Sequence, residues 1–347
     1  MPKTYRVVQW ATGNIGGRAL RQVIRSPRLE LAGVFVYGEG KVGLDAGELC
    51  GEPATGIVAT TDRQAVLDLG ADCVLYMPRA FDVDDVAALL SSGMNVVTTL
   101  SELFDGGSAL PQEARQRIEQ ACAQGGTSAY ATGSSPGFIS EALPMALLSL
   151  QQRVDGVLIE EFADLSKRNS PELLFDLMGY GADPAAFDPR RYSHLLASFS
   201  PSLRTLARAA GREAEDWTCD GEVAVARHDV TIAAGTIPAG RVAAQRTRVV
   251  GSTAGEDVVS FVATWYCTDD LDPAWELGAT GWRVHVRGDA PMTADLPFPV
   301  PAEQLGELTP GYTANPPVNA VPYVVEAAPG ILRGADLPPM VPGGPLA

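Results

Sequence analysis

Short apolar runs alternate with amphipathic stretches over the first 135 residues of the chain. The apolar runs are rich in β-branched residues and end at turn residues, which predicts short strands buried on both faces. We expect these strands at 7–10, 29–36, 73–76, 95–99 and 127–131. The stretches between them carry apolar residues at helical spacing, at 14–25, about 62–69, 81–92 and 111–124. Alternating strands and helices predict a parallel sheet with helices on both faces.

The pattern changes after Pro136. It predicts a helix at 138–151, a strand at 154–162, and a largely helical stretch at 171–212 that is interrupted at 179–190. Long alternating segments with turn residues between them follow at 222–233, 241–250, 258–267 and 282–286, which predicts a mainly antiparallel sheet. A last helix is expected at about 310–335. We therefore expect one domain at 1–135, rejoined by that helix, and an α+β domain at 136–309.

The first strand ends in a turn of small residues that opens a helix. On the G-x-G-x-x-G template this turn has Ala11, Gly13 and Gly16, so alanine replaces the first glycine. Such a turn holds the pyrophosphate of a dinucleotide on backbone N–H groups at a helix N-terminus. We therefore expect a Rossmann-like, doubly wound first domain in which Thr12 and the segment 13–16 (Gly13, Asn14, Ile15, Gly16) hold pyrophosphate. A purely structural turn is the alternative reading.

Further candidate residues follow the ends of the second and fourth predicted strands. Tyr37, Glu39 and Lys41 lie where a cofactor ribose would bind; Glu39 favours NAD and Lys41 favours NADP, so the choice between the two stays open. Thr99 ends strand 95–99 and Glu102 follows it, where the nicotinamide ring and its substrate would lie. A carboxylate there could activate water or ammonia, or shuttle a proton. The alternative is a surface or helix-capping glutamate with Ser101 as the cap.

The loop 133–138 follows the last strand of the first domain and enters a helix. Its small residues would let Ser135 and Pro136 approach the carboxamide of a nicotinamide, and Phe138 follows at once. A plain domain-boundary turn with Pro136 at a helix start is the competing interpretation.

Composition narrows the class of protein. The net charge is −16 and no Lys/Arg block is present, which argues against nucleic acid and anionic membranes as partners. Five scattered cysteines predict reduced, buried thiols, and three dispersed histidines give no support for a metal site. No membrane-spanning run and no signal peptide are visible, so we expect a cytoplasmic protein.

Six motifs spread along the chain carry a resemblance to a known family. They lie at 7–16, 41–49, 95–103, 133–138, 175–181 and 319–331. With them the chain resembles the dihydrodipicolinate reductase-like, NAD(P)-dependent amine dehydrogenases, a group that includes 2,4-diaminopentanoate dehydrogenase. The resemblance implies that Glu102 is the catalytic residue and that Phe138, Arg168, Phe175 and Met178 line the substrate pocket. It also implies a homodimer, paired through the sheet of the second domain.

The implied reaction is reductive amination of a small ketone or aldehyde with ammonia, and the reverse oxidation of a primary amine, with NADP or NAD as cofactor. Two alternatives stay open: reduction of a cyclic imine or other carbonyl without ammonia, and a dinucleotide-binding sensor without turnover. Of the His-His-x-x-Lys run found in dihydrodipicolinate reductase proper, this chain keeps Lys167 but lacks both histidines, and it has Lys167 and Arg168 where amine dehydrogenase relatives tend to show an aromatic residue. This pair either contacts a carboxylate on the substrate or forms an exposed turn.

Overall fold

Two compact units make up the chain in the computed structural model, which describes residues 3–343. The first unit runs to Phe138 and resumes at Thr309, and the second unit is Ile139–Leu308. The chain therefore leaves the first unit once and returns to it within the C-terminal helix.

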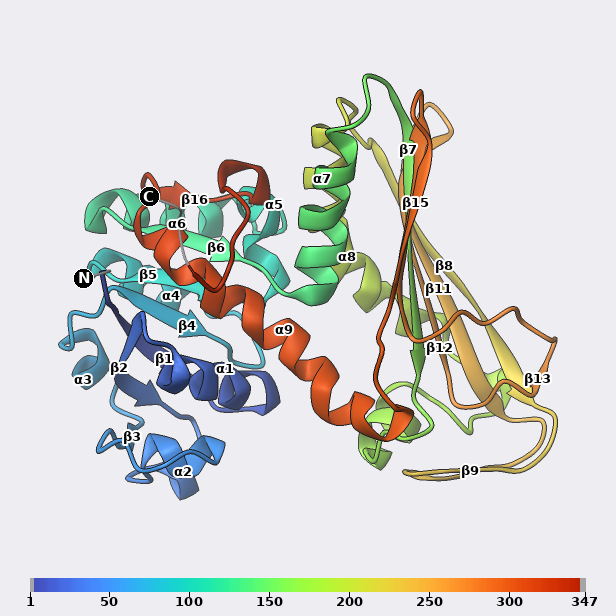
Figure 1. Cartoon of the computed structure of the whole chain (residues 1–347), viewed down its shortest axis with the longest axis horizontal. Helices are drawn as coiled ribbons and strands as arrows, with labels where there is room; N and C mark the ends of the chain where they lie inside the picture. Colours follow the sequence, from blue (N-terminus) through green and yellow to red (C-terminus); the bar gives the residue numbers. More distant parts are fainter. Residues whose placement is uncertain (1–2, 344–347) are drawn as a thin grey trace. The chain divides into compact units, whose positions relative to one another are not determined.

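The first unit is built on a seven-stranded sheet in the order β16-β6-β5-β4-β1-β2-β3, in which every pair is parallel (Figure 1). The chain winds outward from β1 to β2 and β3, and then restarts on the other side of β1 with β4. This is the doubly wound order of a Rossmann fold, with its switch point between β1 and β4. The predicted α/β fold class is confirmed. The strands are β1 (Tyr5–Trp10), β2 (Leu29–Phe35), β3 (Ala59–Thr60), β4 (Cys73–Tyr76), β5 (Asn95–Thr98), β6 (Ser128–Ala131) and β16 (Gly330–Ile331).

Helices cover both faces of this sheet. Successive strand residues point to opposite faces, and apolar residues occur on both, so each face needs a covering layer. Val8 and Val74 face a core that includes Val86 and Ile118 from the helices on one side. Val7 faces a second core, formed with the N-terminal and C-terminal helices. The helices are α1 (Asn14–Arg25), α2 (Ala46–Cys50), α3 (Arg63–Leu67), α4 (Val83–Ser91), α5 (Phe104–Gly107), α6 (Gln112–Gly125) and α9 (Ala302–Val325).

Polar side chains fix where two of these helices begin. The Asp62 carboxylate accepts the backbone N–H groups of Gln64 and Ala65 at 2.9 and 3.1 Å, as expected for the start of α3. Asp82 caps α4 in the same way. Such caps satisfy the N–H donors that have no partner in the first helical turn.

The second unit is built on a seven-stranded sheet in the order β13-β8-β11-β12-β7-β14-β15. Only β12 and β7 are parallel neighbours, so the predicted mainly antiparallel sheet is confirmed. Helix α8 packs on one face, where Phe199 stacks on Phe261 with ring centroids 3.9 Å apart. The elements are α7 (Leu143–Leu148), α8 (Ser193–Ala209), β7 (Val154–Asp164), β8 (Asp216–Ala226), β9 (Val230–Ile232), β10 (Gly235–Ile237), β11 (Val242–Thr253), β12 (Glu256–Tyr266), β13 (Leu271–Asp272), β14 (Gly281–Gly288) and β15 (Met292–Pro297).

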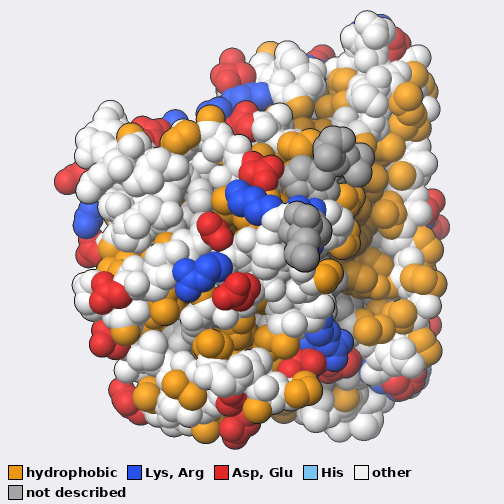
Figure 2. Space-filling view, turned by 60° about the vertical axis from the view of Figure 1, so that its left-hand side comes forward, with side chains coloured by type: hydrophobic (Ala, Val, Ile, Leu, Met, Phe, Trp, Pro, Cys, Tyr) orange, Lys and Arg blue, Asp and Glu red, His pale blue; other side chains and the backbone are white. Residues whose placement is uncertain are grey.

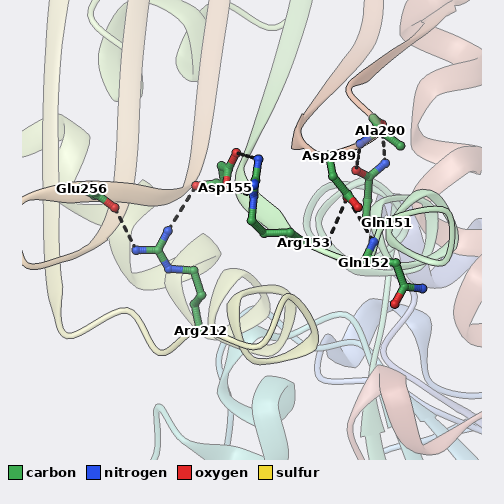
Figure 3. A network of polar contacts seen from close by, with 8 residues as sticks. All are labelled: Gln151, Gln152, Arg153, Asp155, Arg212, Glu256, Asp289 and Ala290. Atoms are coloured by element: carbon green, nitrogen blue, oxygen red, sulfur yellow. Dashed lines mark hydrogen bonds and ion pairs between the residues drawn. The ribbon is translucent and has the colours of Figure 1, made fainter.

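A polar network joins the turns at one end of this sheet (Figure 3). The Asp289 carboxylate accepts the backbone N–H groups of Gln152 and Arg153, and these bonds lower the pKa of Asp289. The Gln151 side chain donates to the Ala290 carbonyl at 2.5 Å and accepts the Ala290 N–H at 3.0 Å. The segment that enters β7 is thus tied to the β14–β15 turn, which fixes the register of these strands.

Several elements differ from the sequence prediction. The predicted strand 222–233 is wrong, because β8 ends at Ala226 and β9 pairs with β10 in a separate hairpin. The helix expected at about 310–335 begins at Ala302 and ends at Val325, and Gly330–Ile331 is a strand of the first sheet. The helix expected at 138–151 is wound as a π-helix over Ser134–Ala142, with non-helical backbone at residues 135–137, before α7. Strand β15 was not predicted.

Candidate nucleotide-binding and catalytic site

The turn between β1 and α1 gives each template position a different role. Ala11 has φ 72°, a left-handed backbone that normally favours glycine. A side chain on Gly16 would place its Cβ 2.2 Å from the Ala11 carbonyl oxygen, so close packing of helix on strand requires this glycine. A Cβ on Gly13 would meet no atom within 4 Å. Gly13 therefore leaves open the space through which an anion would approach the helix.

Buried Gln9 stabilises this turn by a hydrogen bond from its side chain to the backbone of the turn. Its side chain is 0% exposed on β1 and its Nε2 donates to the Ala11 carbonyl at 2.8 Å. Among the residues that the structure describes, its Oε1 has no hydrogen-bond partner. The bond fixes the peptide after the left-handed Ala11, a position that carries glycine in the standard motif. Gln9 was not among the predicted site residues, because an amide within an apolar strand gives no periodic signal.

The N-terminus of α1 has no side-chain cap. The N–H groups of its first turn point along the helix axis without helical carbonyl partners, which makes this end an anion site. Asn14 is exposed, and its Oδ1 accepts a hydrogen bond from Arg18 Nε at 3.3 Å. Ile15 is half-buried against the core of the same sheet face. An uncapped helix end beside the open space at Gly13 suits a pyrophosphate.

The loop after β2 bends back to this turn through Lys41. Its Nζ donates to the Thr12 carbonyl at 2.9 Å and to Thr12 Oγ1 at 3.1 Å. The Glu39 carboxylate is exposed, with no hydrogen-bond or ion-pair partner in the described chain. The structure thus brings Lys41 and Thr12 together, two of the predicted cofactor residues.

Tyr37 is fixed by aromatic contacts at the end of β2. Its hydroxyl accepts a hydrogen bond from Trp10 Nε1 at 3.0 Å, and its ring meets Phe35 edge-on at 5.2 Å. The tyrosine is still 51% exposed. A held but exposed ring at a strand end is a suitable surface for a ribose or adenine group.

Glu102 lies just beyond the carboxyl end of β5, in the 3-10 turn Ser101–Leu103. The glutamate is half-buried, and its carboxylate has no hydrogen-bond or ion-pair partner among residues 3–343. Ser101 does not cap this turn, whose N-cap is Leu100, so the helix-capping alternative is wrong. Thr99 is the residue immediately after β5 and is half-buried.

A left-handed backbone follows Glu102. Asp105, Gly106 and Gly107 have φ of 52°, 64° and 76°. The buried Asp105 carboxylate forms an ion pair with Arg333 at 3.5 Å, and the Arg333 guanidinium also covers Gly106. A C-terminal arginine therefore fixes the loop that presents Glu102.

The loop after β6 lies beside the Glu102 loop, since the Thr132 N–H donates to the Thr98 carbonyl at 2.9 Å. The Ser134 and Thr313 hydroxyls are hydrogen-bonded at 2.7 Å, and the Phe138 N–H donates to the Gly133 carbonyl at 2.8 Å. Ser135 Oγ is buried without a hydrogen-bond partner in the described structure, and the half-buried Pro136 follows it. This hydroxyl has the capacity to bind a polar group of a ligand.

The predicted substrate residues belong to both units. Phe138 is 37% exposed at the end of the first unit's N-terminal part. Phe175 and Met178 pack at the edge of one apolar cluster of the second unit, with buried Leu174 and Tyr180. Arg168 is exposed and has no side-chain partner among the described residues, whereas Lys167 faces Glu303 at 3.9 Å.

Other classes of site find little support in the structure. Within residues 3–343 no group of three His, Cys, Asp or Glu could hold a metal ion, and no helix is both long and apolar enough to cross a bilayer. All five cysteines are free thiols; four are buried, whereas Cys219 is half-buried, contrary to the prediction. Figure 2 shows acidic and basic side chains interspersed on one face rather than gathered in a basic field.

Comparisons with known proteins agree with this geometry. No protein-family model matches the chain. An amine dehydrogenase from Streptomyces virginiae is 29% identical over 346 residues, covering 95% of each chain. The solved structure of an amine dehydrogenase from Mycobacterium smegmatis is similar with a TM-score of 0.73 at 18% identity, covering 97% of each chain.

A probable dehydrogenase from Thermotoga maritima shares the fold with a TM-score of 0.56 at 13% identity, covering 95% of this chain and 92% of that chain. These matches extend over both units, so they concern the whole architecture and not the dinucleotide-binding unit alone. The S. virginiae relative confirms the resemblance to amine dehydrogenases that the six sequence motifs predicted, and the two solved structures confirm the fold.

Proposed function

We propose that the protein is an NAD(P)-dependent amine dehydrogenase. It joins ammonia and a small, mostly apolar ketone or aldehyde to give a primary amine, and it catalyses the reverse oxidative deamination. The observation that carries this proposal is the full-length similarity to the amine dehydrogenase of S. virginiae, together with a doubly wound sheet whose first turn is open at Gly13.

The first unit is the proposed dinucleotide-binding domain. Residues 12–16 would hold the pyrophosphate, Tyr37, Glu39 and Lys41 the adenosine ribose, and Thr99, Ser135 and Pro136 the nicotinamide end. The uncapped α1 N-terminus and the unpartnered Ser135 hydroxyl support this arrangement. When bound, the nicotinamide supplies or accepts the hydride.

Glu102 is the proposed catalytic acid and base. Amination of a carbonyl requires a proton to leave the attacking ammonia and a proton to reach the oxygen that departs as water. A half-buried carboxylate at the end of β5, with no partner of its own in the described chain, is free to carry both protons. The expected loss on its removal is about a hundredfold to ten-thousandfold in rate.

The second unit is the proposed substrate-binding and dimerisation domain. Its Phe175 and Met178 would supply apolar surface to the substrate, and Arg168 would bind a carboxylate where the substrate has one. Phe138, which belongs to the first unit, is a further proposed pocket residue. We further propose a homodimer paired through the second unit's sheet, working in the cytoplasm. The free thiols support the location, because reducing compartments keep cysteines unpaired.

A screen of cofactor reduction over aliphatic amines and diamines at alkaline pH, with NAD and NADP in parallel, tests the function. We expect reduced cofactor to form with at least one primary amine. In the reverse direction, a ketone or aldehyde panel is offered with and without ammonium. Carbonyl-dependent cofactor oxidation that is indifferent to ammonium would instead identify a carbonyl reductase, and cofactor binding without any turnover would identify a sensor.

A further inference from the structure

The end of β2 has the charge expected for a phosphate rather than for a ribose hydroxyl. In Rossmann folds that bind NAD, a carboxylate near this strand end accepts the ribose 2′-hydroxyl, whereas a cation receives the 2′-phosphate of NADP. Here β2 ends at buried Phe35, and buried Val36 follows. The first carboxylate after the strand in the sequence, Glu39, begins the exposed 3-10 turn Glu39–Lys41. The Asp85 carboxylate also lies near Phe35, but it is paired with Arg63.

Lys41 is held where it can reach a ligand in this loop. Two hydrogen bonds to Thr12 fix its ammonium beside the turn that would hold the pyrophosphate. An ammonium has three N–H donors, so one donor remains for a ligand. The side chain is exposed and forms no ion pair in the described chain, so its charge is not neutralised by a carboxylate.

Arg63 supplies a second cation next to the same strand end. Its guanidinium lies over the Phe35 ring at 5.7 Å, and its Nε and Nη2 bind Asp85 at 2.6 and 3.3 Å. A guanidinium has five N–H donors, so this bidentate pair leaves donors that face outward on a side chain that is 55% exposed. Tyr37 adds a phenol whose oxygen accepts from Trp10, which leaves its own proton to donate.

We propose that Tyr37, Lys41 and Arg63 form a subsite for a phosphate monoester, the 2′-phosphate of NADP(H), and that the enzyme prefers NADP(H) to NAD(H). This inference rests on the proposed dinucleotide site. The chain's net charge of −16 repels a phosphate dianion, so local cations are needed to bind one. The preference therefore weakens as salt is raised.

Calorimetric titration with adenosine 2′,5′-bisphosphate and with 5′-ADP tests the subsite without any turnover. The wild type is expected to bind the 2′,5′-bisphosphate about tenfold or more tightly than 5′-ADP, since a charged hydrogen bond is worth about that factor. In Lys41→Ala the bisphosphate should lose about tenfold in affinity and 5′-ADP less than about threefold, and Lys41→Arg should recover most of the loss. Arg63→Ala should likewise weaken the bisphosphate more than 5′-ADP, and Arg63→Lys, which keeps a charge near Asp85, should recover most of that loss.

Lys3→Ala is the matched control, because it removes the same charge just before the opposite end of β1. It should leave both affinities unchanged. Equal affinity of the wild type for the two nucleotides, or an equal loss of both in Lys41→Ala, overturns the subsite while leaving the dinucleotide site standing. No binding of either nucleotide overturns the dinucleotide site and this inference with it.

Discussion

In the turn between β1 and α1, one glycine is needed for stability and another for ligand binding. Gly16 faces the Ala11 carbonyl at a distance that excludes any side chain, whereas Gly13 faces open space. The two glycines of one motif therefore serve different ends, one in packing and the other in access.

We predict opposite outcomes for two alanine substitutions. Gly16→Ala should lower the free energy of unfolding by about 1–3 kcal/mol, because the turn must shift to admit a methyl group. Gly13→Ala should change it by less than about 0.5 kcal/mol but weaken cofactor binding about tenfold, because the methyl fills the anion's approach. Urea denaturation and cofactor titration measure the two effects. Similar losses of stability in both variants would contradict the division of roles.

Gln9 gives a prediction of its own. Gln9→Met keeps the volume of the side chain but removes the donor to the Ala11 carbonyl, at a cost of about 1–3 kcal/mol for the unsatisfied group. If the amide positions the turn, the Michaelis constant for the cofactor rises while kcat is largely kept. If only stability falls and the Michaelis constant is unchanged, Gln9 has a purely structural role.

Among the elements of the site, the loop after β5 is held by a contact with a residue that is far away in the sequence. The Asp105–Arg333 pair ties it to the segment that follows β16. This tie explains how three successive left-handed residues remain in one conformation next to Glu102.

Arg333→Met should destabilise the protein by about 1–3 kcal/mol, because it removes an ion pair of the buried Asp105 carboxylate, although the half-exposed Arg333 is partly screened by solvent. The loop that presents Glu102 should loosen, so kcat should fall more than the affinity for the cofactor. Arg333→Lys serves as the control and should retain much of both. Wild-type kcat in Arg333→Met would show that this tie does not position Glu102.

The elements that were predicted correctly are those whose apolar residues form a clear periodic pattern. Strand β4 was predicted at its observed bounds, and α1 as well, because their apolar residues are uninterrupted or recur at helical spacing. Strand β15 escaped prediction because it is a short edge strand in which no residue is fully buried, and its sequence lacks the run of β-branched residues that predicts a strand. The start of α9 escaped because Pro310 follows its first two turns, and an interior proline predicts a helix boundary there, whereas the observed helix continues through it.

The candidate site was only partly visible in the sequence for a similar reason. Gly13, Lys41 and Glu102 were each predicted separately, from their positions after the ends of predicted strands. The contacts of Lys41 with Thr12 and of Asp105 with Arg333 join residues that are far apart in the chain, so no local pattern predicts them.

At the scale of the whole molecule, buried acids determine how the protein responds to alkali. Burial raises the pKa of Cys122 from 9.0 to about 11, of Cys267 from 9.0 to about 12, and of Tyr192 from 10.0 to about 12. The folded protein therefore binds more protons than the unfolded chain at alkaline pH. Stability from these groups is complete below the unfolded pKa values and is lost as the pH rises through the folded ones.

We predict that the melting temperature falls between about pH 9 and pH 11–12, and that Cys122→Ala has a shallower decline than the wild type. Thermal unfolding followed across this range measures both. A melting temperature that stays constant to pH 11 would contradict the burial of these groups. The result also sets the upper pH at which amine oxidation can be assayed.

Ammonium-dependent oxidation of NADPH with a small ketone or aldehyde, measured on the wild type and on Glu102→Gln, tests both the reaction and the role of Glu102. Glu30→Gln is the matched control, since it changes an exposed glutamate near the amino end of β2. We expect turnover by the wild type and the control only when ammonium is present. In Glu102→Gln the rate should fall at least about a hundredfold with cofactor affinity retained. Turnover without ammonium would contradict reductive amination, and a wild-type rate in Glu102→Gln would contradict a catalytic role for Glu102.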